Sequence, residues 1–132
     1  MSPIISEHIY LFLQNMGFHG SYLKTLLAQK DIQLNLGDGG TLYLEELSDH
    51  LLVAMEIKLR DHEVLDKLQQ LLESVHHMHH GAFDIQVGLV GHNRPVVAIQ
   101  LPFDAVETAS LEKAAHVAAD LLHENVAREA YL

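Results

Sequence analysis

Residues 32–59 read IQLNLGDGGTLYLEELSDHLLVAMEIKL, and apolar side chains occupy every second position through most of this stretch. A period of two is typical of strands that bury one face, and it predicts strands over 32–36, 42–45 and 51–59. Gly37–Gly40 and Ser48–His50 carry the residue types of tight turns. The stretch therefore predicts a three-stranded antiparallel meander with one buried face.

The segment before this meander predicts an apolar helix. Ser2 and Pro3 fit an N-cap followed by a first helical position, and Gly17 fits the end of the helix. Apolar residues recur at helical spacing and extend beyond one face, so the helix either binds a partner or is covered on two sides by its own domain. The candidate partner-binding residues are Ile5, Ile9, Tyr10, Phe12 and Leu13.

A second helix is predicted after the meander, from Asp61 as its N-cap to a stop at Gly81. Its apolar stripe is wide and rich in leucine, and consists of Val64, Leu65, Leu68, Leu71, Leu72 and Val75. Leu65 and Leu72 lie at the edge of this stripe, where they could either meet a second subunit or line the core. The candidate dimer-interface residues are Leu65, Leu68, Leu72 and Val75.

The remaining sequence predicts two more strands and a final helix. Phe83–Leu89 alternates again, and Val96–Leu101 is apolar on both faces, which is typical of a central strand. After Pro102, Asp104 or Ser110 is expected to cap a helix rich in alanine. Residues 21–30 fit either one or two helical turns or an apolar loop. Residues 1–132 are thus predicted to form a single α+β domain, α-βββ-α-ββ-α, with a twisted antiparallel sheet.

The composition limits the function classes. The chain has 132 residues, an apolar fraction of 48% and no cysteine, which favours a globular domain without disulfides. Its formal net charge of -10 repels phosphate backbones and anionic lipid surfaces. The start lacks the pattern of a secretory signal, and no apolar run is long enough to span a bilayer. We therefore expect a cytoplasmic protein that neither binds nucleic acid nor inserts into a membrane.

No motif in the sequence predicts catalysis. Glu45 and Glu46 are adjacent in a predicted strand, so they point to opposite faces and cannot act as a carboxylate pair. The sequence HHMHH at 76–80 is conspicuous, because histidines four positions apart can bind a metal. Histidines in a last helical turn also interact favourably with the helix dipole. We expect no enzymatic activity, no cofactor and no physiological metal, with a His-rich metal-binding domain as an alternative.

The predicted order of elements resembles the class I type III secretion chaperones (CesT/SycE-like), and within them the SycN-like subgroup. The resemblance covers essentially the whole chain and rests on diffuse patterns of apolar spacing and turns. These patterns are LQNMG at 13–17, IQLNLGDGGTLYLEEL at 32–47, GLVG at 88–91 and LEKAAHVAADLL at 111–122. HHMHH and residues 17–30 match no pattern of the family.

This resemblance implies a small acidic chaperone without enzymatic activity or cofactor. Such bacterial chaperones dimerise mainly through the second helix and a neighbouring strand, and the N-terminal segment of a secreted effector or gatekeeper wraps around the dimer in an extended form. For the SycN-like subgroup it implies a second, different chaperone subunit and a gatekeeper of the YopN type as the secreted protein. The alternative is a family member that sequesters a regulator. Whether the dimer is homo- or heteromeric stays open.

Overall fold

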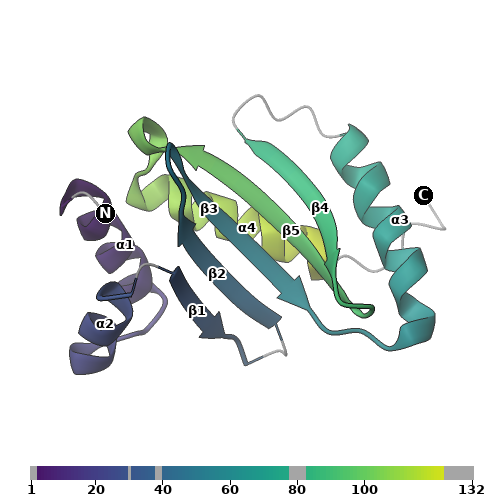
Figure 1. Cartoon of the computed structure of the whole chain (residues 1–132), viewed down its shortest axis with the longest axis horizontal. Coiled ribbons are helices and arrows are strands. Elements are labelled where there is room, and N and C mark those ends of the chain that lie inside the picture. Colours follow the sequence, from purple (N-terminus) through teal and green to yellow (C-terminus); the bar gives the residue numbers. More distant parts are fainter. Residues whose placement is uncertain (1–2, 30, 38–39, 78–82, 124–132) are drawn as a thin grey trace.

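The computed structural model describes residues 3–29, 31–37, 40–77 and 83–123 (Figure 1). The elements are α1 (Pro3–Asn15), α2 (Gly20–Leu27), β1 (Asp31–Asn35), β2 (Gly40–Glu46), β3 (His50–Ile57), α3 (Asp61–His77), β4 (Asp84–Val90), β5 (Arg94–Pro102), the 3-10 turn η1 (Phe103–Ala105) and α4 (Thr108–His123). The α+β class and the order α-βββ-α-ββ-α are confirmed. Helix α2 is an addition to this order, and it shows that the ambiguous residues 21–30 are largely helical.

The strands form one antiparallel five-stranded sheet in the spatial order β1-β2-β3-β5-β4. Strand β5 lies between β3 and β4, which confirms the central position predicted for Val96–Leu101. The outer strands are β1 and β4. Figure 1 shows the twist of the sheet, with α1 and α2 near β1 and α3 beside β4.

One face of the sheet forms the core beneath α4. Leu44, Val53 and Ile99 lie side by side across β2, β3 and β5, and each is almost completely buried. Helix α4 contacts β3, β5 and α1. Its Ala114 and Ala118 are fully buried, and their small side chains let the helix lie close to the sheet. The alternation of the sequence therefore directs one set of side chains into this core and leaves the other set on the opposite face.

A side chain of α1 contacts the N-terminus of α4. Asp104 lies in η1 and Ser110 lies inside α4, so neither caps this helix as the sequence predicts. Instead, His8 Nδ1 on α1 accepts a hydrogen bond from the backbone N–H of Thr108 at 3.1 Å. A distant imidazole thus satisfies one of the backbone donors that the first helical turn leaves free.

The other helix ends also have local causes. Gly17, two residues after the end of α1, adopts a φ of +104°, a conformation that glycine takes without a steric penalty. Asp61 is the first residue of α3 instead of its N-cap, and the backbone N–H of Arg60 donates to Glu63 Oε1 at 3.3 Å. This contact is the backward half of a capping box. The predicted stop at Gly81 lies outside the described residues.

Candidate functional site

Most of the candidate partner-binding residues on α1 lie inside the subunit. Ile5, Ile9, Phe12 and Leu13 are buried in the core, and Tyr10 alone of the five candidates is exposed, by 37%. The structure therefore corrects the sequence interpretation, because the strongest apolar stripe of α1 covers the domain's own core. In the folded chain these four residues are covered by the subunit itself.

A different set of apolar side chains faces outward from the two N-terminal helices. Ile4, Leu11 and Met16 on or next to α1 are exposed, as is Tyr22 on α2. The ring of Tyr22 lies 5.8 Å from that of Phe18, so the two aromatic residues support each other at the junction of the helices. Ile4 and Leu11 lie off the regular stripe of α1, whereas Met16 continues that stripe and is nevertheless exposed, so periodicity alone does not identify this outer set.

Helix α3 turns two leucines outward. Leu65 is 75% exposed and Leu72 is 58% exposed, whereas Leu71 is completely buried. The candidates Leu68 and Val75 are half-buried at the margin between these surfaces. Leu65 and Leu72 therefore do not line the core of the described subunit. Their contact with a second subunit remains a hypothesis.

The inner side of α3 explains this orientation. Lys67 and Gln70 are buried together with Val64 and Leu71, so the buried surface of the helix is centred away from the leucine-rich stripe. A helix turns 100° per residue, and burying Lys67 and Gln70 rotates Leu65 and Leu72 to the outside. Sequence analysis could not predict this rotation, because lysine and glutamine ordinarily lie on the solvated side of a helix.

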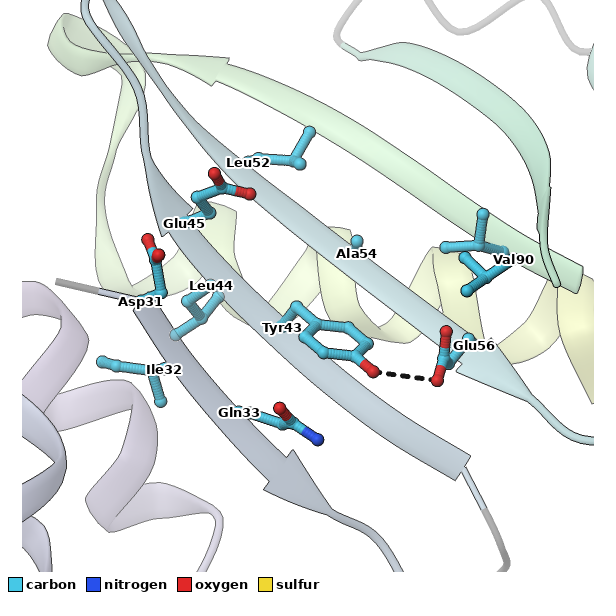
Figure 2. A pocket seen from close by; sticks show the side chains of 11 residues that line it. Asp31, Ile32, Gln33, Tyr43, Leu44, Glu45, Leu52, Ala54, Glu56 and Val90 are labelled. Carbon is cyan, nitrogen blue, oxygen red and sulfur yellow. Dashed lines mark hydrogen bonds between the residues drawn. The ribbon is translucent and has the colours of Figure 1, made fainter. Parts of the chain in front are cut away.

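The sheet face opposite α4 carries a groove of about 450 Å³. Figure 2 looks onto this face, with α4 behind the sheet. Its apolar lining includes Tyr43, Leu52, Ala54 and Val96, and the small Ala54 lies near the middle of the exposed strands. Asp31, Glu45 and Glu56 bring three carboxylates to the lining, and no lysine or arginine is among the described residues that line it. The groove is therefore apolar in the centre and acidic around it.

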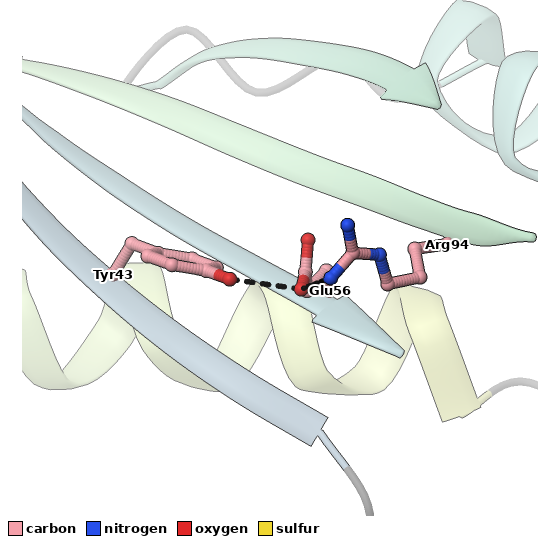
Figure 3. A network of polar contacts seen from close by, with 3 residues as sticks. All are labelled: Tyr43, Glu56 and Arg94. Carbon is pink, nitrogen blue, oxygen red and sulfur yellow. Dashed lines mark hydrogen bonds and ion pairs between the residues drawn. The ribbon is translucent and has the colours of Figure 1, made fainter. Parts of the chain in front are cut away.

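A polar network closes one end of the groove (Figure 3). The Tyr43 hydroxyl donates to Glu56 Oε1 at 2.8 Å, and Arg94 Nη1 lies 3.5 Å from the same oxygen. The Glu56 side chain is only 5% exposed, and that of Arg94 is 44% exposed. Burial raises the pKa of the Tyr43 hydroxyl above its usual range, and the hydrogen bond to the Glu56 carboxylate raises this pKa further.

The network was not found by sequence analysis, although one signal was available. Tyr43 and Glu56 both occupy positions that alternate away from the core, and the register pairs Tyr43 with Ala54. Glu56 is consequently the diagonal neighbour of Tyr43 on the same face, within reach of a long aromatic side chain. That relation depends on the strand register, which the turn residues alone did not define.

The histidine cluster falls mainly outside the described part of the chain. His76 is exposed near the end of α3, and residues 78–80 are not described. Within the described ranges, no group of three or more histidine, cysteine, aspartate or glutamate side chains is placed to hold a metal ion. In the same ranges, no helix is long and apolar enough to cross a membrane.

The profile of the family described as type III secretory system chaperone SycN matches residues 4–127. The chain belongs to this family. No curated protein matches the sequence of this SycN-family chaperone. The family profile thus spans all the described elements of the fold, from α1 to α4.

Solved structures support the fold of this SycN-family chain. A chain of the heterodimeric complex ExoU–SpcU, from the type III secretion system of Pseudomonas aeruginosa, is similar with a TM-score of 0.52 and 18% identity. The alignment covers 87% of this chain and 98% of that one. YbjN from E. coli is similar with a TM-score of 0.58 and 13% identity, over 92% of each chain.

Proposed function

We propose that this SycN-family chain is a class I (CesT/SycE-like) chaperone subunit of the bacterial cytoplasm. It dimerises through the outer face of α3, with an identical or a different chaperone subunit. The dimer binds the N-terminal segment of a secreted protein, and the best candidate is a gatekeeper of the YopN type. Binding keeps this segment extended and masks its apolar residues, so the function needs neither a cofactor nor catalysis.

The observation that carries this proposal is the pair of outward-facing leucines on α3. Leu65 and Leu72 are exposed on a helix whose opposite side is already buried against the subunit. Two large aliphatic side chains one heptad, or about two helical turns, apart form an apolar strip, and burying such a strip against a second helix is favourable. A second subunit that presents a matching helix would cover Leu65, Leu72 and the margin formed by Leu68 and Val75.

Other features support the binding of an extended segment. Strands β1 and β4 end the sheet, and an outer strand offers backbone donors and acceptors to an added strand. Ile4, Leu11 and Tyr22 offer exposed apolar surface near the β1 side of the molecule. Main-chain pairing would supply affinity, and the apolar side chains would select the residues of the partner.

Co-purification tests this function. The chain is expressed alone and together with the products of neighbouring secretion genes, and the proteins that elute with it are identified by mass spectrometry. We expect a stable dimer of chaperone subunits that captures the N-terminal fragment of one secreted protein. A chain that stays monomeric with every candidate chaperone, and that captures no secreted protein, would contradict the proposal.

A further inference from the structure

The groove on the face opposite α4 contains neighbouring acidic side chains that the fold does not require. Asp31 and Glu45 are direct partners across β1 and β2, so two carboxylates stand opposite each other on the same face. Like charges in this position destabilise a sheet. Figure 2 shows the two side chains together at one end of the groove. A cation placed between them would remove this repulsion.

The centre of the groove is shaped by small side chains. Ala54 on β3 pairs with Ala98 on β5, and Tyr43 on β2 pairs with Ala54 on its other side. Leu52 and Val96 line the groove around Ala54. The small side chain of Ala54 leaves space in the groove that a larger residue would fill. The volume of about 450 Å³ lies within the range of sites that hold a few side chains.

The far end of the groove holds a third carboxylate in a fixed position. Glu56 lines the groove, and its Oε1 accepts from Tyr43 and lies near Arg94. Its Oε2 takes part in neither contact. Arg94 beside Oε1 offsets the charge of this carboxylate, so the uncompensated acidic side chains of the described lining are Asp31 and Glu45 at the other end.

We infer that the groove receives a cationic amphipathic segment of the secreted protein, an inference that rests on the proposed chaperone function. An apolar side chain of the segment lies above Ala54, and a lysine or arginine lies between Asp31 and Glu45. Charge complementarity favours this occupant over a second copy of the chain, whose net charge is -10. The groove runs from Asp31 on β1 to Val96 on β5 and Val90 on β4, and its lining does not include the α3 leucines assigned to the dimer.

The test compares two synthetic amphipathic peptides that share one leucine pattern and carry either lysine or glutamate at every polar position. Fluorescence anisotropy measures their binding to the full chain at low and high salt. The lysine peptide is expected to bind at least about tenfold more tightly than the glutamate peptide, with the difference reduced by salt. Equal binding of both peptides would overturn the inference.

Two matched double variants separate the groove from general attraction to an acidic protein. Asp31→Asn with Glu45→Gln removes two charges at the groove, and Asp104→Asn with Asp120→Asn removes two exposed charges on η1 and α4. The groove variant is expected to lose about tenfold in affinity for the lysine peptide, with the other variant nearly unchanged. Equal losses in both variants would show attraction by net charge only and would overturn the inference.

Two further readouts exclude a purely structural explanation. The groove double variant should melt at the same or a higher temperature than the parent chain, because it removes a like-charge pair. Ala54→Leu should block the lysine peptide by filling the groove, while the dimer and its circular dichroism spectrum stay unchanged. If the groove variants bind the lysine peptide normally while the parent chain captures a secreted protein, the groove assignment is wrong and the proposed chaperone function is unaffected. A monomeric chain with normal peptide selectivity would instead refute the dimer.

Discussion

Replacement of the two outward leucines on α3 tests the dimer most directly. Leu65→Gln with Leu72→Gln removes the apolar strip and keeps residues that favour a helix. Burying a leucine completely contributes about 1.5–3 kcal/mol, and the exposures of 75% and 58% mean that most of this contribution is still available at both positions. The strip is therefore worth about 2–4 kcal/mol from each subunit.

The consequence for dimerisation follows from that value. If both subunits lose the strip, the association free energy falls by about 4 kcal/mol or more, which corresponds to about a thousandfold in the dissociation constant. The folded subunit loses little, because neither side chain belongs to its core. Sedimentation velocity over a concentration series measures the association, and circular dichroism melting of the monomer measures the fold.

The controls lie on the same helix. Asp66→Asn alters an exposed residue on another side of the helix and should leave both measurements unchanged. Leu71→Gln places a polar side chain at a completely buried position and should unfold the subunit itself. The reasoning is refuted if the Leu65 and Leu72 double variant forms the parental dimer with the parental dissociation constant, since the interface would then lie elsewhere.

Three further predictions concern other parts of the molecule. Leu68→Asp should weaken the dimer and also lower the melting temperature of the monomer, because this residue is half-buried at the margin of both surfaces. Tyr43→Phe should remove a tyrosine that titrates above the usual range in an alkaline absorbance titration. The stability that the proton on Tyr43 contributes is full below its unfolded pKa of 10.0 and is lost as the pH rises through the higher folded value, which urea denaturation at several alkaline pH values can follow. His8→Ala should cost about 0.5–2 kcal/mol in urea denaturation near neutral pH, because Thr108 loses the acceptor of its backbone N–H; an unchanged midpoint would mean that water replaces the imidazole.

The strands could be predicted because apolar and polar residues alternate along them, and this alternation places the apolar side chains on one face of the sheet. Residues such as Leu42, Leu44 and Val53 repeat with a period of two, and any register that buries them places their neighbours on the opposite face. The central position of β5 followed in the same way, because Val96–Leu101 is apolar at both parities. These inferences needed only local periodicity.

The surfaces could not be predicted to the same extent, since they depend on how elements are oriented against one another. The wide stripe of α3 allowed several rotations, and the burial of Lys67 and Gln70 selected the one that exposes Leu65 and Leu72. The four buried candidates on α1 were selected for partner binding because they form the most regular apolar stripe. In the structure that stripe packs into the core of the subunit. The groove needed the register that brings Asp31 opposite Glu45.

The two surfaces share a property that separates them from the rest of the subunit. The exposed leucines on α3 leave favourable burial unused, and the Asp31–Glu45 pair places like charges together, so each is a local cost that folding alone gives no reason to keep. They also lie at different ends of the sheet, with α3 beside β4 and the acidic pair on β1 and β2 (Figure 1). A second subunit on α3 would therefore leave the acidic end of the groove open, and the two contacts would use different side chains.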